Sequence, residues 1–358
     1  MASEFFGPTV AIVILNHNGR ELLRQFLPPV LRHSPGMEVY VADNGSTDGS
    51  LSFVKEEFPE VRTIALDHNF GFCQGYNEAL RQVTADYYVL LNSDVEVTAG
   101  WIAPIIRLME RDRGIGAVQP KIRSYDQPHT LEYAGAGGGF LDRWGYPFCR
   151  GRVFEEVEED QGQYDDVLPV FWATGACLFV RADLYWQLGG LDDDFFAHME
   201  EIDLCWRMQN AGYKVYYYGQ SQVFHVGGGT LHKSNPRKTY YNFRNCLSLL
   251  YKNLPDSELT TTIYGRLVLD GVAAVRMAIS GDWADAKAVW EAHRYFFRHK
   301  KKLKKKRKAI GTKRSLKGLF GFYPKSIVWQ HFVKGKKHFA ELDVPDGAPF
   351  SSQVLGKV

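Results

Sequence analysis

The sequence has few cysteines and no long hydrophobic run. Its five cysteines are scattered through 358 residues without a Cys-x-x-Cys pair, which argues against a zinc site and fits a reducing compartment. Near the start only residues 10–15 are continuously apolar, too short for the core of a signal peptide. The apolar stretch 267–279 is interrupted by Asp270 and Arg276, so no segment approaches the roughly 20 residues that a membrane-spanning helix needs. We therefore expect a soluble or peripheral protein.

Acidic residues are missing from one part of the chain. Residues 294–338 hold 17 Lys or Arg and no Asp or Glu, whereas the remainder carries 26 basic against 41 acidic residues. The net charge of +2 therefore hides an acidic body and a basic tail. Because 45% of the residues are hydrophobic, the chain can bury a sizeable core in one large domain or two smaller ones. Disorder throughout is excluded.

Short apolar runs alternate with helical patterns up to residue 124. Strands are expected at 9–15, 38–42, 61–66, 87–91 and 115–119, and helices at 19–33, 49–58, 72–83 and 100–112. Such alternation predicts βαβ units and a parallel sheet. The glycine-rich residues 135–139 and the acidic residues 155–166 mark loops or a hairpin. Further regular segments are expected at 170–180, 201–211, 214–218, 239–254, 259–280 and 282–308, the last three helical.

Polar residues end three of the expected strands. The first strand runs into Asn16, the second into Asp43 and the fourth into Asn92-Ser93-Asp94. Carboxyl ends of strands form the ligand-binding edge of open α/β sheets, so these side chains should share one edge. Asp43 can accept a hydrogen bond from a nucleobase or a ribose, and Asp94, with Glu96 as an alternate, is a candidate ligand for Mg²⁺ or Mn²⁺. Each residue alone is also an ordinary turn former, and only the combination favours a nucleotide site.

A second group of acids lies at 200–203, at the expected start of a helix. Glu200, Glu201 and Asp203 follow two phenylalanines and could include a general base. Favourable placement of acids in a first helical turn is the alternative explanation, and it accounts for one of the three. His225, which precedes the glycine run 227–229, could bind a metal, although a lone histidine on a strand is more often structural.

Taken together, these segments resemble the inverting family 2 glycosyltransferases with the GT-A nucleotide-diphospho-sugar-transferase fold, especially their rhamnosyltransferase-like branch. The resemblance covers residues 9–254 and implies an α/β fold with a mostly parallel central sheet flanked by helices. It implies inverting transfer of rhamnose or a similar hexose from a UDP- or dTDP-linked donor to a glycan or lipid-linked acceptor. The expected cofactor is Mg²⁺ or Mn²⁺, and the expected pathway is cell-surface polysaccharide synthesis.

The resemblance also gives a role to each motif. The residues that it places in the donor site are Asn16, Asp43, Asn69, Gly71, Phe72, Gly75, Asn77, Asn92 and Asp94. Those that it places on the acceptor side are Trp172, Thr174, Gly175 and Ala176. Asp94 and His225 would bind the metal. The catalytic base stays open among Glu200, Glu201 and Asp203, because this chain has Glu200-Glu201 where family members commonly have Glu-Asp. Arg244-Asn245 matches an Arg-Asn pair without an assigned role.

The resemblance and the charge pattern predict two parts of the chain. We expect a GT-A catalytic domain at 1–235, with a donor half at about 9–124 and an acceptor half at about 125–235, and a helical C-terminal extension at 236–358. Within the extension, the basic segment 294–338 is expected to face an anionic membrane surface, since Trp283, Trp290 and Phe297 recur at a seven-residue spacing before it. A solvated charged face over a core-facing aromatic stripe is the alternative. The expected location is cytoplasmic, peripheral at the inner face of the cell membrane.

Two other function classes stay open. A sugar-phosphate nucleotidyltransferase would share a parallel sheet and a metal-binding carboxylate, but it should carry a Gly-rich phosphate loop with an arginine directly after the first strand. Residues 16–20 do not supply that loop convincingly. A nucleic-acid-binding protein could use the basic segment for phosphate contacts. The acidic body would repel a nucleic acid, so no nucleic-acid partner is expected.

Overall fold

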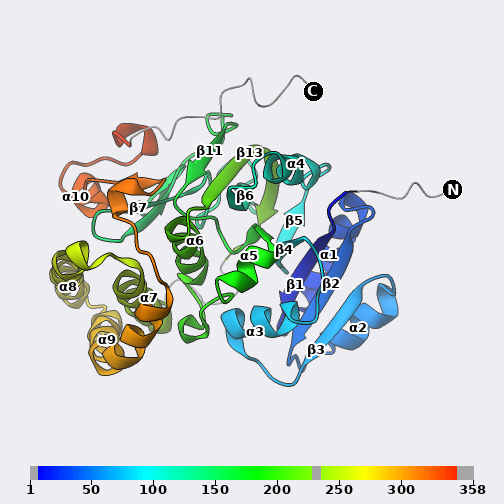
Figure 1. The fold of residues 1–358 in the computed structure, drawn as a ribbon, viewed down its shortest axis with the longest axis horizontal. Helices are drawn as coiled ribbons and strands as arrows, with labels where there is room; N and C mark the ends of the chain where they lie inside the picture. The colour runs from blue at the N-terminus through cyan, green and yellow to red at the C-terminus, as the bar shows by residue number, and fades with distance from the viewer. Residues whose placement is uncertain (1–6, 228–234, 345–358) are drawn as a thin grey trace.

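The computed structural model describes residues 7–227 and 235–344, which form an α/β body with a helical part on one side (Figure 1). A nine-stranded sheet crosses the described part of the body in the order β11-β13-β6-β12-β4-β1-β2-β3, and β5 pairs with β13. Its strands are β1 (Val10–Asn16), β2 (Glu38–Asn44), β3 (Arg62–Leu66), β4 (Tyr87–Asn92), β5 (Val95–Val97), β6 (Ile115–Ser124), β11 (Val167–Val170), β12 (Cys177–Arg181) and β13 (Lys214–His225).

The sheet is mostly parallel, as predicted. β1 pairs in parallel with β2 and β4, β2 with β3, and β6 with β13. β12 is antiparallel to both β4 and β6, between which it lies, and β5 and β11 are antiparallel to β13. The predicted regular segment 170–180 is therefore interrupted, because β11 ends at Val170 and β12 begins at Cys177.

Helices cover both faces of this sheet, which explains why its strands are continuously apolar. One face is covered by α1 (Arg20–His33), α2 (Ser50–Glu57) and α4 (Ala103–Arg111), and the other by α3 (Gly71–Leu80), α5 (Ala182–Gln187) and α6 (Glu200–Asn210). In β1, Ile12 lies in the same apolar cluster as Leu23 of α1. The next residue, Val13, points the other way and clusters with Tyr76 of α3 and Ile202 of α6.

A second, smaller sheet has the order β10-β9-β8-β7-β14. Its strands are β7 (Gly139–Asp142), β8 (Pro147–Cys149), β9 (Arg152–Val153), β10 (Glu156–Val157) and β14 (Phe322–Tyr323). The first four form the hairpins expected between residues 135 and 166. β14 comes from the basic tail and pairs in parallel with β7, with Tyr323 fully buried. The backbone N–H of Ile327 donates to the Asp142 carboxylate (2.9 Å), so this part of 294–338 packs against the body.

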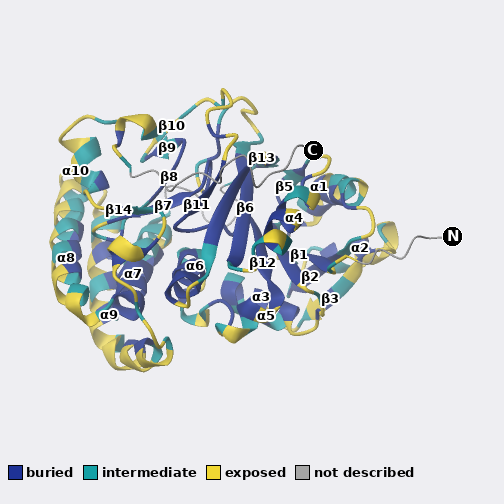
Figure 2. Ribbon diagram, turned by 45° about the horizontal axis from the view of Figure 1, so that its top comes forward, coloured by how far each residue is buried: buried dark blue, intermediate teal, exposed yellow. Residues whose placement is uncertain are grey.

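The C-terminal part is formed by α7 (Pro236–Asn253), α8 (Asp256–Ile279), α9 (Trp283–Ala309) and α10 (Ile327–Phe332), together with single turns at Leu316–Gly318 and Phe339–Glu341. Phe296 and Leu303 of α9 pack on Leu247 and Tyr251 of α7. Exposed residues line the outer sides of α8 and α9 (Figure 2). Each helix in the described part of the chain is too short or too polar to cross a membrane.

The aromatic stripe of α9 lies on its outer side. Trp283, Trp290 and Phe297 are 70%, 57% and 56% exposed, whereas the side of α9 that packs on α7 carries smaller and aliphatic residues around Phe296. The interpretation of a core-facing stripe is therefore wrong for these three side chains.

Part of the basic run is neutralised inside the protein. Lys306 of α9 and Lys252 of α7 both form ion pairs with Asp192, and Lys306 also contacts Asp194 (2.6 Å). Asp192 caps the single turn Asp193–Phe195 that precedes α6, and Asp194 lies within that turn. These ion pairs join the C-terminal helices to the loop that leads into α6.

Candidate functional site

The carboxyl ends of β1, β2 and β4 bring three predicted site residues to one sheet edge. Asn16 stands opposite Asp43 in the β1–β2 ladder, and Leu15 stands opposite Asn92 in the β1–β4 ladder. The buried amide of Asn16 donates to the Asp43 carboxylate and to the Ser46 hydroxyl, both at 3.3 Å. The oxygen of the same amide is buried without a hydrogen-bond partner. These residues form one polar corner, as their positions in the sequence predicted.

Two asparagines shape the connection from β3 to α3. Asn44, at the end of β2, accepts from the backbone N–H of Phe70 (2.9 Å) and donates to the carbonyl of Gly71 (3.0 Å). Asn69 accepts from the N–H of Gly71 (2.8 Å). Gly71 has a φ of +77°, and a β-carbon there would lie 2.7 Å from the ring of Phe196. The sequence needs glycine at this position because the backbone is left-handed and the Phe196 ring occupies the space.

Gly75 and Asn77 of α3 contact other parts of the protein. A β-carbon at Gly75 would lie 2.9 Å from the amide nitrogen of Asn44, so this glycine makes room for Asn44. The buried amide of Asn77 donates to the carbonyl of Leu191 (2.8 Å) and the carboxylate of Asp193 (2.7 Å), and it accepts from the Tyr185 hydroxyl (2.7 Å). Its hydrogen bonds therefore position the loop before α6.

Asp94 and His225 meet where β4, β5 and β13 come together. Asp94 lies in the turn between β4 and β5, and His225, the last residue of β13, stands opposite Val95. The His225 Nε2 atom is 3.1 Å from the Asp94 carboxylate and 3.4 Å from the amide nitrogen of Asn92. Glu96, the alternate ligand, stands opposite Phe224 in the same ladder. The two residues predicted to bind a metal are thus in direct contact.

Glu132 completes this cluster and was missed by sequence reasoning. Its buried carboxylate lies 3.6 Å from the Nδ1 atom of His225, on the other side of the ring from Asp94. Burial opposes the charge on His225, but the hydrogen bond with Asp94 and the charges of Asp94 and Glu132 outweigh burial and raise the pKa of His225 to about 10. Burial likewise opposes the charge on Asp94, yet His225 lowers the pKa of that carboxyl.

The residues before α6 adopt a strained loop. Phe196, His198 and Met199 have φ values of 64°, 69° and 73°, in the left-handed region that side chains other than glycine rarely adopt. Burial and the charge of Lys238 lower the pKa of His198 to about 4, and its Nε2 atom is buried without a partner. The backbone N–H of Phe72 donates to the carbonyl of Phe196 (3.1 Å). This loop, residues 194–199, therefore contacts the start of α3.

Arg244 and Asn245 of α7 hold this loop in place. The amide of Asn245 donates to the carbonyls of Phe195 (3.1 Å), Ala197 (2.9 Å) and His198 (2.7 Å). Arg244 donates to the carbonyls of Asp194 (2.9 Å) and Phe195 (2.8 Å). The Arg-Asn pair, left without a role from the sequence, thus fixes the backbone that leads into Glu200.

The three acids of α6 have different environments. Asp203 is fully buried between Arg207 (2.8 Å) and Lys252 (2.9 Å). Burial opposes its charge, but these two cations lower its pKa. Glu200 is buried and Glu201 is half-buried, and each has one carboxyl oxygen without a partner. Burial raises the pKa of Glu201 to about 7, and burial together with the charge of Glu201 raises the pKa of Glu200 well above its ordinary value.

The link between β11 and β12 runs past both groups of residues. A β-carbon at Gly175 would lie 3.4 Å from the Phe72 ring and 3.9 Å from the β-carbon of Glu201. The carbonyl of Ala176, one residue on, accepts from the backbone N–H of Asn92 (3.0 Å), two residues before Asp94. An ionisable carboxyl and the Asp94–His225 pair therefore flank the same short segment.

The other predicted residues of this link turn inward. The Nε1 atom of Trp172 donates to the carbonyl of Phe140 (2.9 Å), and the hydroxyl of Thr174 donates to the carbonyl of Ala134 (3.0 Å). Both side chains are buried. They fix the course of the segment on which Gly175 and Ala176 lie.

The sequence of this chain is similar to those of known sugar transferases. The family model of glycosyl transferase family 2 matches residues 11–189. The chain is 27% identical over 229 residues to the N-acetylglucosaminyl-diphospho-decaprenol L-rhamnosyltransferase of Mycobacterium tuberculosis, covering 60% of this chain and 75% of that protein. It is 26% identical over 223 residues to the O-antigen biosynthesis protein RfbC of Myxococcus xanthus, covering 61% of this chain but only 17% of that protein.

Solved structures share the fold. GalNAc-T7, determined with UDP, GalNAc and Mn²⁺, matches with a TM-score of 0.55 at 16% identity, over 71% of this chain and 49% of that one. The mannosyltransferase PcManGT from Pyrobaculum calidifontis, in complex with GDP-Man and Mn²⁺, matches with a TM-score of 0.51 at 14% identity, over 86% of each chain. At these identities the likeness shows the fold alone, and that fold is the expected GT-A type.

Proposed function

The chain belongs to glycosyl transferase family 2, and we propose that this glycosyltransferase moves a hexose, rhamnose or a similar sugar, from a UDP- or dTDP-linked donor to a glycan or lipid-linked acceptor with inversion. The named activity of the mycobacterial relative supports both the sugar and the type of acceptor. The present protein would act in the synthesis of a cell-surface polysaccharide. Residues 1–235 would carry out catalysis, and residues 236–358 would form an extension.

One observation carries the proposal: Glu201 and the Asp94–His225 pair flank the segment around Gly175. An inverting transfer needs a base on the acceptor side of the anomeric carbon and positive charge on the leaving-group side. We assign the base to Glu201, because Asp203 is held between two cations, and because burial and the charge of Glu201 raise the pKa of Glu200 well above its ordinary value. Glu201 is the acid of the three whose pKa lies near neutrality.

The Asp94–His225 pair fits a divalent cation. A carboxylate and an imidazole nitrogen 3.1 Å apart can both turn toward one ion, provided that the ion displaces the proton that the raised pKa of His225 keeps on the ring. Glu132, beside the far ring nitrogen, would then hold the imidazole in the required orientation. No group of three or more His, Cys, Asp or Glu forms a complete metal cage in residues 7–227 and 235–344. Diphosphate oxygens and water would supply the remaining ligands, as is common for Mg²⁺ and Mn²⁺ sites. The Mn²⁺ in the two solved structures supports this class of cation.

The mechanism follows from these positions. Asp43 and Asn16 would bind the nucleoside at the sheet edge, with the diphosphate near Asp94. When bound, the cation supplies charge that stabilises the departing nucleoside diphosphate. Glu201 takes the proton from the acceptor hydroxyl as its oxygen bonds to the anomeric carbon, while the bond from that carbon to the diphosphate oxygen breaks on the opposite face. The configuration at the anomeric carbon inverts in this single displacement.

Replacing the metal-binding carboxylate tests the proposal. For Asp94→Asn we expect the affinity for UDP or dTDP in the presence of Mn²⁺ to fall by about 10- to 100-fold, because one ligand of the cation is lost. Titration calorimetry with and without Mn²⁺ measures this. Asp183→Asn, an exposed aspartate of α5, is the control and should bind as the unchanged protein does. Equal Mn²⁺ dependence in Asp94→Asn would contradict the assignment.

We further propose that the C-terminal helices meet an anionic membrane surface. The support is the exposed aromatic stripe of α9, Trp283, Trp290 and Phe297, beside a run of exposed lysines at 300–305. Flotation with phosphatidylglycerol vesicles tests this, with phosphatidylcholine vesicles as the uncharged control. Equal recovery with both would speak against an electrostatic contribution to membrane binding.

A further inference from the structure

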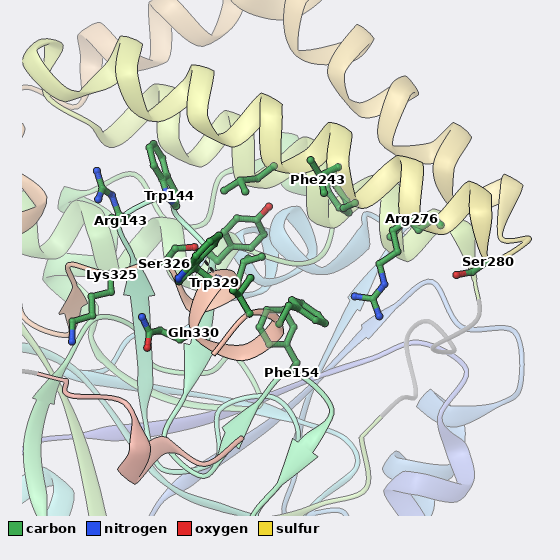
Figure 3. Close-up of a pocket in the computed structure, with 18 of the residues that line it drawn as sticks. Arg143, Trp144, Phe154, Phe243, Arg276, Ser280, Lys325, Ser326, Trp329 and Gln330 are labelled. Atoms are coloured by element: carbon green, nitrogen blue, oxygen red, sulfur yellow. Dashed lines mark hydrogen bonds between the residues drawn. The ribbon is translucent and has the colours of Figure 1, made fainter. Parts of the chain in front are cut away.

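A large apolar groove lies between α8 and α10 (Figure 3), and the residues of the nucleotide corner are not among those described in its lining. Its volume is about 1080 Å³, at the upper end of the roughly 300–1,000 Å³ typical of small-molecule sites. Leu269, Val272, Ala273 and Met277 of α8 form one wall. Val328, Trp329, Phe332 and Val333 form the opposite wall. The size and lining suit a long hydrocarbon chain.

The floor of the groove is fixed by buried polar contacts. Tyr146, which lines the groove, donates its hydroxyl to Asp270 (3.1 Å). Asp270 is fully buried and also accepts from Arg266 (2.6 Å), and it lies 3.2 Å from the Nε2 atom of His293 in α9. This network joins the β7–β8 hairpin to α8 and α9. The groove is therefore preformed.

The charges at the ends of the groove are mainly positive. Figure 3 shows Arg143 and Lys325 at one end and Arg276 at the other. Lys325 is paired with Asp343 (2.8 Å), whereas Arg143 and Arg276 have aromatic partners, Trp144 and Phe332, and no ion pair within the described residues. Asp282 is the one acidic residue in the described lining. This charge distribution complements an anionic head group attached to an apolar chain.

The groove opens onto an exposed apolar stripe of α8. Val272 lines the groove and is 63% exposed. Tyr264, Val268, Val275 and Ile279, which together with Val272 recur every three or four residues on the same helix, are between 60% and 82% exposed. An occupant that enters the groove from a bilayer would pass along this stripe, so it does not have to cross an exposed polar surface.

The groove also lies next to the proposed catalytic region. Phe243 of α7 lines the groove, and the next two residues, Arg244 and Asn245, hold the 194–199 loop that leads into Glu200. Gly145 of the β7–β8 hairpin contacts Cys246, whose sulfur is 3.8 Å from that of Met199. One helix of the extension thus separates the groove from the loop before the catalytic acids.

We infer that this groove binds the hydrocarbon chain of an anionic, phosphate-bearing lipid, with the head group at Arg143 or Arg276. The inference rests on the proposed function, since it identifies the lipid-linked acceptor as the substrate class whose chain is held here. The occupant is a lipid rather than a second protein copy because Arg143 and Arg276, which have no ion pair among the described residues, stand at the two ends of a mainly apolar groove.

Farnesyl diphosphate, a 15-carbon chain with a diphosphate head group, is the probe. Titration calorimetry on the full chain, without donor and with divalent cations chelated, should show binding at least about tenfold tighter than that of inorganic diphosphate. Val272→Asp places a charge in the groove and should weaken binding at least about tenfold. Val268→Asp, one turn earlier on the same exposed stripe but outside the lining, should bind as the unchanged protein does.

A second pair of measurements covers the case in which Val272→Asp fails to fold. Arg143→Gln and Arg276→Gln each change an exposed side chain. One of the two should weaken binding of farnesyl diphosphate while leaving binding of uncharged farnesol unchanged, and no effect of either would overturn the inference. Equal affinity for farnesyl diphosphate and inorganic diphosphate, or equal loss in Val272→Asp and Val268→Asp, would overturn the inference. A dimer in sedimentation experiments that Val272→Asp dissociates would also overturn it, because the groove would then belong to a second copy.

The two proposals fail separately. If farnesyl diphosphate does not bind but UDP or dTDP binds with Mn²⁺, the assignment of the groove is wrong and the transferase proposal stands. If farnesyl diphosphate binds in the groove while Asp94→Asn leaves Mn²⁺-dependent nucleotide binding unchanged, the metal assignment is wrong and the assignment of the groove to a lipid stands.

Discussion

Glu200 and Glu201 are neighbours in sequence but differ in their surroundings. Glu200 is buried, and burial together with the charge of Glu201 raises its pKa well above the ordinary value, whereas Glu201 is half-buried beside Gly175. A protonated carboxyl and a carboxamide have similar size and both donate a hydrogen bond, so glutamine mimics Glu200 in its protonated state. The same substitution at Glu201 removes the group that takes the proton.

Glutamine substitutions therefore separate the two acids. We expect Glu201→Gln to lower kcat by about 10²- to 10⁴-fold, the usual contribution of a general base, with donor affinity unchanged. Glu200→Gln is the matched control and should keep most of the activity. Initial rates of sugar transfer, together with calorimetric donor binding, measure both. The reverse pattern would assign the base to Glu200.

The pH dependence of turnover tests the same assignment. Burial raises the pKa of Glu201 to about 7, and the base must be ionised to act, so kcat should rise with pH through about 7 and level off above it. The raised pKa also means that the folded protein holds this proton more tightly than the unfolded chain. The contribution of Glu201 to the free energy of unfolding should therefore fall as pH rises from the ordinary carboxyl range to about 7. A kcat that does not change between pH 6 and 8 would count against Glu201.

At the scale of elements, local sequence patterns predicted the large sheet and its helices well. β1, β2, β4 and the helices α7 to α9 begin and end within a few residues of the expected positions, because apolar periodicity and glycine breaks are local signals. The strand β14 could not be predicted, since its pairing with β7 depends on a contact between residues about 180 positions apart. The interruption between β11 and β12 could not be predicted, because the link residues 171–176 are buried and mostly apolar, like the residues of the two strands.

The site was predicted less completely than the fold. The polar strand ends that gather Asn16, Asp43 and Asn92 follow from the parallel topology. The role of Glu132 could not be predicted, because it lies in an irregular segment and acts through His225. Arg207, four residues after Asp203, marks this acid locally as an ion-pair partner, but its second cation, Lys252, comes from a different helix and could not be predicted.

The contact between Gly71 and Phe196 gives a prediction at this scale. Gly71 and Gly100 both have left-handed backbones, with φ of +77° and +73°, but only Gly71 has a ring where a β-carbon would lie. Gly100→Ala should therefore cost about 1 kcal/mol of stability from backbone strain alone. Gly71→Ala should cost more and also lower turnover, because Phe196 and the 194–199 loop must move. Thermal melts and transfer rates of the two variants measure the difference, and equal behaviour would contradict the steric contact.

At the scale of the whole molecule, the basic tail and the acidic body interact through specific contacts. Asp192 accepts ion pairs from Lys252 of α7 and Lys306 of α9, and these three side chains join the C-terminal helices to the loop before α6. The predicted basic segment is therefore divided in its roles. Lys302 and Lys306 bind the body, while Leu316, Tyr323 and Ile327 are buried in it.

Removing the shared acid should weaken this connection. Asp192→Asn removes one of the two carboxylates that pair with the buried Lys252, and we expect a loss of about 3 kcal/mol of stability. Asp256→Asn should have a smaller effect, because the Asp256 carboxylate is 93% exposed and the buried Arg307 keeps its hydrogen bonds to the carbonyls of Tyr251 and Leu254. Urea unfolding followed by circular dichroism compares the two variants. A similar small effect in both would show that the Asp192 pairs add little to stability.

The packing of Phe196 on Gly71 has an evolutionary consequence. A side chain at position 71 and an aromatic ring at position 196 compete for one volume, so neither can change freely while the other is kept. Descendants of this protein that gain a β-carbon at 71 should carry a smaller residue at 196, which makes the two positions inherit their substitutions as a pair.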